Sequence, residues 1–221
     1  MSSTLKDPRL DDMIAKISEM SSEGKVTELS VLSRMIGTAI NCAGKPSGKG
    51  TGKVDAHPGK ASSGSVRIGG QVWMSHNLQM PADPENGIYV VNGETYFTWE
   101  AAVRVAKSYG NGWRLPSRED WTKLADACGA SSAGSHLKST SGWNGENGVD
   151  TYGFGGKPTG YALPGGSKVG DGGVRGYFWS STPDGTAGAY YRCLTGICDF
   201  FGGYYCHRSY GFSVRLLRDS A

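Results

Sequence analysis

The chain has 221 residues and a net charge of +3, enough for one ordinary domain with additional segments. Glycine supplies 35 residues, a share that predicts many turns and loops rather than long helices. The nearly balanced charge argues against a nucleic-acid-binding surface, and no run of about eighteen apolar residues predicts a membrane span.

Residues 1–42 are predicted to form a short helical hairpin. Asp7 is a good N-cap with Pro8 at the first helical position, and a second run with helical spacing starts at Leu29. Two such helices cannot bury both of their apolar faces alone, so they either pack on the following domain or pair with copies of themselves. We expect them to serve homo-oligomerisation or attachment. The N-terminal residues lack the basic start and apolar run of a secretion signal, which predicts cytoplasmic synthesis.

Residues 43–65 are predicted to be a flexible linker. The segment AGKPSGKGTGKVDAHPGKASSGS has no periodicity and almost no apolar content. Its Gly/Lys repeats are one residue too short for a phosphate-binding loop, and no strand precedes them. Residues 66–221 then form the main predicted domain.

The first half of this domain carries clear helix and strand signals. Alternating apolar residues from Val66 predict a strand that bends at a Gly-Gly pair. A helix is predicted from an N-cap at Thr98 to a stop at Gly110. A second helix is predicted after a capping box formed by Ser117 and Asp120.

The second half is less regular. About fifty residues after Gly129 lack periodicity and are expected to be held in place by four buried aromatic residues, Trp143, Tyr152, Phe154 and Tyr161. A Pro-Asp-Gly turn at 183–185 then predicts a β-hairpin. The last segment predicts a strand with alternate inward side chains, namely Phe212, Val214 and Leu216.

Residues 188–210, between these last strands, have an unusual composition. They are rich in Tyr, Phe, Cys and Gly, and they contain no Lys, Glu, Gln, Met or Trp. Tyr and Phe supply large contact areas at a low cost in rotamer entropy, as in antibody loops. We therefore expect a binding surface with exposed Tyr191, Phe200, Phe201, Tyr204 and Tyr205. The residues expected in the core are Trp113, Trp121 and Trp179.

Six ordered motifs, QVWMSHNL, GWRLPSREDW, LKSTSGWN, DTYGF, YFWSST and YGFSVRLLRD, resemble the paralogous surface-protein domain first noted in Fibrobacter. That domain is a bacterial branch of the C-type lectin-like fold and is related to formylglycine-generating enzymes. The same arrangement is similar to the variable proteins of diversity-generating retroelements. The resemblance implies an α+β, C-type lectin-like fold with a small antiparallel sheet, two flanking helices and long organised loops.

The resemblance also implies a function: a ligand-binding display protein whose surface is rewritten at adenine-containing codons, for receptor binding or adhesion by a phage or bacterium. Its partner would be a protein or glycan on a target cell surface, and its location a virion or a cell surface. The framework residues implied are Ala189, Tyr190, Arg192, Leu194 and Arg208. The variable, ligand-binding residues implied are Tyr191, Cys193, Gly196, Cys198, Phe200, Phe201, Tyr204, Tyr205, Cys206, His207, Ser209 and Tyr210. The alternative is an invariant lectin-like module with a structural or carbohydrate-binding role.

The same stretch also raises the hypotheses of a metal site and of an enzyme active site. Cys193, Cys198, Cys206 and His207 offer soft ligands, but their spacing matches no common zinc module. We expect no cofactor and no enzymatic activity, because no catalytic constellation accompanies the cysteines. A disulfide between two of these cysteines, and a structural calcium ion near 143–150, stay open.

Overall fold

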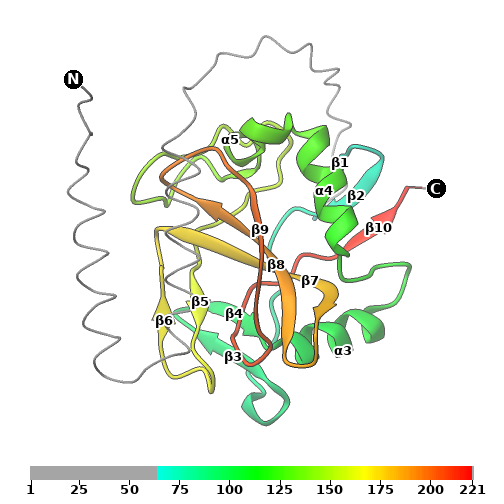
Figure 1. The fold of residues 1–221 in the computed structure, drawn as a ribbon, viewed down its shortest axis with the longest axis vertical. Helices are drawn as coiled ribbons and strands as arrows, with labels where there is room; N and C mark the ends of the chain where they lie inside the picture. The colour runs from blue at the N-terminus through cyan, green and yellow to red at the C-terminus, as the bar shows by residue number, and fades with distance from the viewer. Residues whose placement is uncertain (1–63, 221) are drawn as a thin grey trace. The chain divides into compact units, whose positions relative to one another are not determined.

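The computed structural model describes residues 64–220 (Figure 1). The predicted helical segment 1–42 and all but the last two residues of the predicted linker lie outside them. The described part combines short helices with small antiparallel sheets, as predicted for an α+β fold. No helix in this part has the length and apolar composition needed to cross a bilayer.

Ten strands of the described part form four sheets. One three-stranded sheet, in the order β1–β2–β10, contains Ser65–Ile68, Gln71–Met74 and Leu217–Asp219. The second, in the order β7–β8–β9, contains Arg175–Asp184, Gly188–Thr195 and Gly202–His207. Two hairpins complete the set, β3–β4 (Ile88–Val91, Glu94–Phe97) and β5–β6 (Tyr161–Ala162, Val169–Gly170).

The helices begin where their caps predict. Helix α3 (Trp99–Tyr109) starts after Thr98, whose hydroxyl accepts a hydrogen bond from the backbone N–H of Ala101. Helix α4 (Arg118–Ala127) starts with the predicted capping box between Ser117 and Asp120. A short helix α5 (Ala133–Leu137) and two 3-10 turns, Pro84–Asn86 and Ala130–Ser132, complete the helical elements of the described residues.

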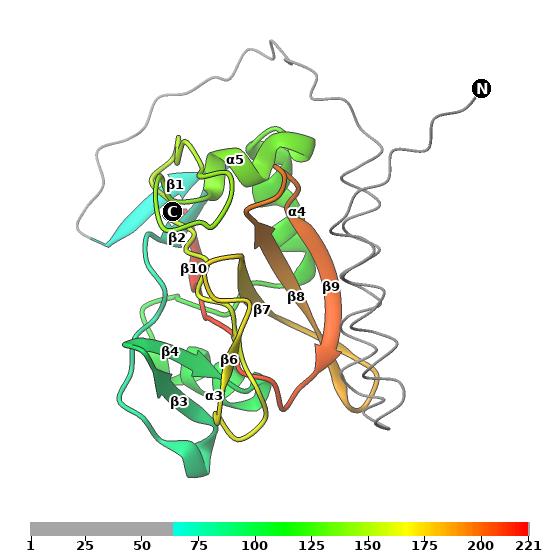
Figure 2. The same cartoon turned by 90° about the vertical axis from the view of Figure 1, so that its left-hand side faces the viewer.

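The elements gather at two ends of this domain. The hairpins β3–β4 and β5–β6 lie with α3 at one end, while α4, α5 and β1–β2 lie at the other (Figures 1 and 2). Strands β7, β8 and β9 run between them, and α4 contacts both β7 and β8. One face of this central sheet therefore lies beside α4.

Strand β7 separates two clusters of buried aromatic rings. Phe178 points into the first, which we call the helix-side cluster and which also contains Trp73, Trp121, Phe154 and Phe201. Tyr177 and Trp179 point the other way, into the hairpin-side cluster with Phe97, Tyr191 and Phe212. Successive side chains of a strand face opposite sides, so one strand supplies both clusters. Trp121 and Trp179 are fully buried, as predicted.

The final segment runs through the centre of the domain. Backbone bridges join Phe212 to Phe97, Ser213 to Phe178, and Leu217 to Arg114. Every residue from 211 to 217 is buried. The predicted burial of Phe212, Val214 and Leu216 is confirmed, but the expected alternation is wrong because neighbouring elements cover the segment on all sides. Only Leu217–Asp219 is regular strand.

Three predictions about aromatic anchors need correction. Trp113 is half-buried rather than buried, because it lies near the surface between Tyr109 and the guanidinium of Arg218. Of the anchors predicted for the irregular stretch, Trp143 and Phe154 are buried. Tyr152 and Tyr161 are only half-buried.

Candidate functional site

The candidate site lies on strands β8 and β9, where side chains alternate between two faces. The register pairs Tyr190 with Tyr205 and Arg192 with Gly203. Gly203, Tyr205 and His207 are exposed, while Tyr190 and Arg192 are half-buried. These five residues share one face of the strand pair, because opposite residues in an antiparallel ladder point to the same side. We call this face the outer face.

The opposite face of β8 and β9 is packed into the domain. The ring of Tyr191 lies 4.9 Å from that of Phe212 and 5.7 Å from that of Tyr177. Cys193 and Cys206 are also buried on this side. The prediction that Tyr191 is exposed is therefore wrong, because the register turns it into the hairpin-side cluster.

The predicted variable residues thus divide by burial. The buried ones are Tyr191, Cys193, Gly196, Phe201, Cys206 and Tyr210, the half-buried ones are Cys198, Tyr204 and Ser209, and the exposed ones are Phe200, Tyr205 and His207. The predicted exposure is confirmed for Phe200 and Tyr205 and is wrong for Phe201 as well as for Tyr191. Tyr204 is only half-buried, because its ring packs against that of Tyr191 on the inner face. Phe201 packs 5.7 Å from Trp121 in the helix-side cluster.

The predicted framework residues play two different roles. Ala189 and Leu194 are fully buried. Arg208 holds the β7–β8 turn, because its guanidinium donates to the carbonyl oxygens of Gly188 and Gly185 and lies 4.2 Å from the ring of Trp99. Tyr190 and Arg192, by contrast, contribute to the outer face.

The loop between β8 and β9 extends the site. Ile197 and Phe200 are 44% and 38% exposed, large values for apolar side chains. Ile197 was missed by the sequence reasoning, which considered only aromatic, Cys, Gly and polar positions. The loop is fixed at its base, since the N–H of Glu146 donates to the carbonyl oxygen of Gly196 and the N–H of Gly134 to that of Asp199. It therefore presents its apolar side chains from an ordered backbone.

A buried lysine, Lys138, holds the backbone of the same loop in place. The Nζ of Lys138, whose side chain is 0% exposed, donates to the carbonyl oxygens of Glu146, Thr195 and Cys198. It also lies 3.6 Å from a carboxylate oxygen of Asp199. One ammonium group thus joins two loops that are distant in sequence. Lys138 lies in the motif LKSTSGWN, but its burial was not predicted, because a lysine in a loop is usually exposed.

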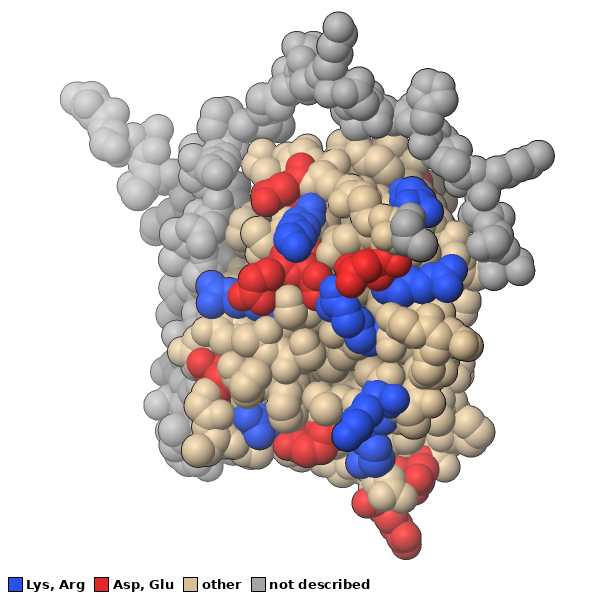
Figure 3. All heavy atoms as spheres, turned by 90° about the vertical axis from the view of Figure 1, so that its right-hand side faces the viewer, with Lys and Arg blue, Asp and Glu red and all other residues tan. Residues whose placement is uncertain are grey.

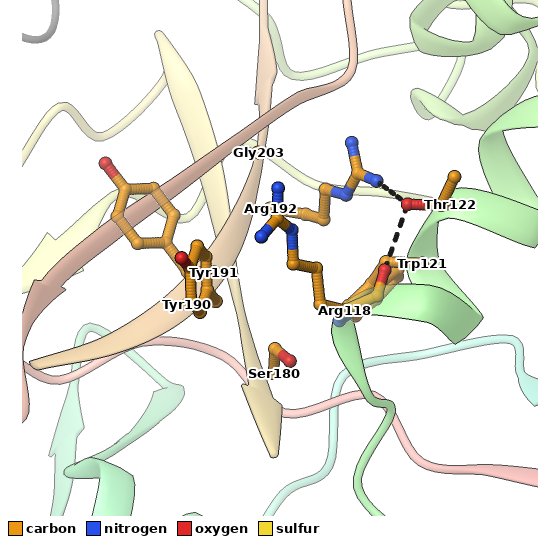
Figure 4. A pocket seen from close by; sticks show the side chains of 8 residues that line it. All are labelled: Arg118, Trp121, Thr122, Ser180, Tyr190, Tyr191, Arg192 and Gly203. Atoms are coloured by element: carbon orange, nitrogen blue, oxygen red, sulfur yellow. Dashed lines mark hydrogen bonds between the residues drawn. The ribbon is translucent and has the colours of Figure 1, made fainter. Parts of the chain in front are cut away.

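A small pocket opens between α4 and the outer face (Figure 4). Its volume is about 160 Å³. Helix α4 contributes Arg118, Trp121 and Thr122, and the central sheet contributes Ser180, Tyr190, Tyr191, Arg192 and Gly203. The two arginine side chains run past each other, one from each wall (Figure 4).

The two arginines are held by different contacts. The guanidinium of Arg192 donates to Thr122 Oγ1 at 2.7 Å and to the carbonyl oxygen of Phe201 at 3.1 Å. The guanidinium of Arg118 lies 4.6 Å from the centre of the Tyr190 ring. Within the described residues, neither arginine forms an ion pair. Burial, together with the nearby charge of Arg118, lowers the pKa of Arg192 from its usual value.

Two of the three cysteines of the stretch are poorly suited to chemistry at neutral pH. Cys193 and Cys206 are buried, and no disulfide joins them. Burial raises the pKa of Cys193 to about 12, and the nucleophilic form of a cysteine is the thiolate. In residues 64–220, no three His, Cys, Asp or Glu side chains lie together as a metal site would require.

The raised pKa of Cys193 predicts a loss of stability in alkali. Above a pH of about 9 the thiol ionises in the unfolded chain but stays protonated in the fold, so the unfolded chain binds fewer protons. Between about pH 8 and pH 10 this thiol should remove about 1.4 kcal/mol of the free energy of unfolding. Urea unfolding of the wild type and of Cys193→Ala at both pH values measures it. The cavity left by the substitution lowers the free energy of unfolding by the same amount at both pH values, so it does not affect the comparison. Equal losses of stability between pH 8 and pH 10 in the two proteins would contradict the prediction.

The segment with a loose similarity to calcium-binding loops binds its own backbone. Asn147 Oδ1 accepts a hydrogen bond from the N–H of Trp143, and Asp150 Oδ1 accepts one from the N–H of Gly155. Burial raises the pKa of Asp150. The acidic and amide oxygens of this segment thus serve to hold an irregular loop.

Acidic and basic side chains lie close together on the surface face drawn in Figure 3, and no large area of one sign is visible there. Among the described residues, Arg114 forms an ion pair with both Asp120 and Asp219. Asp120 is the same residue that closes the capping box of α4. These three charges therefore serve local structure.

These features define a class: a loop-rich α+β domain with a central antiparallel sheet that presents its outer strands beside a helix. The sequence model of the Fibrobacter succinogenes major domain matches residues 82–218. The chain belongs to this family, as the resemblance in its motifs indicated. No curated protein and no solved structure matches the chain.

Proposed function

We propose that this chain is a ligand-binding display protein with a C-type lectin-like fold, whose outer face and β8–β9 loop form the contact surface. The main support for this proposal is the alternation of side chains on β8 and β9. It turns Tyr190, Tyr205 and His207 outward and packs their neighbours inside. Function and fold thus use different residues of the same strands. The partner would be a protein or glycan on a target cell.

We further propose that a retroelement diversifies this surface. Residues 188–210 use only amino acids that adenine mutagenesis of Asn codons can produce, with no Lys, Glu, Gln, Met or Trp. Burial narrows the set of positions that tolerate such change. Replacing a buried aromatic residue costs several kcal/mol, whereas exposed positions usually change stability by less than about 0.5 kcal/mol. The favoured variable positions are therefore the exposed Phe200, Tyr205 and His207 and the half-buried Tyr204 and Ser209.

The contact surface is small, so attachment would gain from several copies. A standard interface uses roughly 20 to 30 residues on each side, more than this surface offers. Display on a virion or cell surface, with oligomerisation through residues 1–42, would raise the effective affinity by on the order of 10² to 10⁴.

The DNA that follows the coding region tests the proposal. We expect a near-copy of the codons for 188–217 close to a reverse transcriptase gene, with AAC or AAT at the favoured variable positions. Adenines placed mainly at codons for buried residues would contradict the assignment of the surface. Absence of any such copy would leave the alternative, an invariant lectin-like structural or carbohydrate-binding module.

A further inference from the structure

The pocket between α4 and the outer face contains two cations that nothing in the described chain neutralises. Arg118 makes no side-chain hydrogen bond and no ion pair among residues 64–220, and its planar group rests on the ring of Tyr190. Each of the two terminal nitrogens of Arg192 donates one hydrogen bond, one to the Thr122 hydroxyl and the other to the Phe201 carbonyl oxygen. A guanidinium carries five N–H donors, so Arg192 retains donors for a further acceptor.

The surroundings keep these donors in place. Thr122 Oγ1 accepts from the Arg192 guanidinium and donates to the main-chain carbonyl oxygen of Arg118, so this hydroxyl joins the Arg192 side chain to the backbone of α4 (Figure 4). Phe201 packs below Arg192, with 5.4 Å between the guanidinium and the ring centre. Fixed guanidinium groups lose little entropy when they bind an anion, and they match the planar oxygens of carboxylate and phosphate.

Gly203 keeps the Arg192 guanidinium accessible. A Cβ atom at position 203 would lie 3.3 to 3.5 Å from three atoms of that guanidinium. The position is exposed strand with ordinary backbone, so other residues would fit the fold there. A larger side chain would instead lie across the guanidinium and cover it.

The carboxylates near the pocket do not neutralise the two arginines. Asp126, one turn along α4 from Thr122, is close enough to influence Arg192 electrostatically but forms no ion pair with it. Asp120 does not line the pocket and pairs with Arg114. The site thus combines a cavity, two positive groups and unused donors.

We propose that the pocket between Arg118 and Arg192 binds the anionic oxygen group of a ligand, a carboxylate, sulfate or phosphate. This inference deepens the proposed function, since the pocket adjoins the outer face and would fix one charged group of a bound partner. A pocket of about 160 Å³ accepts a single small group rather than an extended segment. The aromatic and loop residues around it would then contact the rest of the ligand.

NMR titration of the full chain tests this proposal, with arginine Nε–H signals followed while sodium sulfate, phosphate or acetate is added at constant ionic strength. Saturable shifts at Arg192 are expected with at least one anion, and sodium chloride serves as the reference. Arg192→Gln and Gly203→Leu should each weaken that binding by about tenfold or more. Gly203→Leu is the sharper variant, because it leaves the charge unchanged.

Arg67→Gln is the matched control, because it removes one positive charge from exposed strand β1, in a different sheet. It should bind the anion as the wild type does. Shifts no larger than those with chloride, or equal weakening in Arg67→Gln, would overturn the proposal.

Glucuronate and N-acetylglutamate then identify the carrier of the anionic group. Binding of either acid more tightly than acetate supports the site and shows whether a sugar or a peptide carries the charge. The titration requires no retroelement and no receptor, so it can fail or succeed independently of the DNA test.

Discussion

Phe201→Ala is expected to lower the free energy of unfolding by about 3 to 5 kcal/mol, the usual cost of removing a buried phenylalanine ring. Phe201 is 2% exposed, and it fills the space between Trp121 and the guanidinium of Arg192. The loss removes apolar contacts in the helix-side cluster and leaves a cavity there. Chemical unfolding of both proteins at neutral pH measures the difference.

Phe200→Ala is the matched control, the same substitution one residue away. Phe200 is 38% exposed, so its removal should change stability by less than about 0.5 kcal/mol. If the two variants lose stability equally, the division of this loop into a buried and a displayed residue is wrong. If Phe200→Ala also weakens binding to a target, the same pair separates recognition from folding.

Lys138→Met is the second substitution with a large expected effect. Methionine retains an apolar chain of similar length but leaves three carbonyl oxygens without the ammonium group that they share. An unsatisfied buried acceptor costs about 1 to 3 kcal/mol, and of the three bonds the one to Thr195 is buried and the other two are partly buried, so a total loss of about 2 to 3 kcal/mol is expected. Thermal and urea unfolding measure it, and proteolysis within 195–201 should become faster because the loop loses its anchor.

Lys123→Met is the control for this variant. Lys123 is exposed on α4 and takes part in no ion pair of the described residues, so its replacement should be nearly neutral. A neutral result for Lys138→Met would show that water or local rearrangement satisfies the three carbonyl groups.

Helix caps and turns could be predicted well because their chemistry is local. Thr98 satisfies an N–H three residues away, and the capping box of Ser117 and Asp120 is closed within one helical turn. The Gly69-Gly70 bend and the Pro-Asp-Gly turn were likewise found, because each specifies backbone angles by itself. Such signals do not depend on the rest of the fold.

The faces of β8 and β9 could not be predicted in the same way. Tyr190-Tyr191, Phe200-Phe201 and Tyr204-Tyr205 are pairs of similar residues, so alternation in the sequence does not show which member points inward. The register decides it, and the register depends on the pairing of β8 with both neighbours. Strand β9 itself was missed for the same reason.

The pocket also could not be predicted from the sequence. Arg118 and Arg192 are 74 positions apart, and only the packing of α4 beside β8 brings them together. Arg192 was assigned to the framework because the family resemblance implied it. A charged residue on the open side of a buried strand can serve both roles.

The central path of residues 211–217 has a consequence for synthesis in the cell. This segment bridges β4, β7 and the strand-like residue Arg114, and it delivers β10 to the far edge of β2. The domain therefore cannot close until residues 211–219 have left the ribosome. Chains that stop before residue 211 would lack the strip that joins both aromatic clusters, and they would remain open and be degraded.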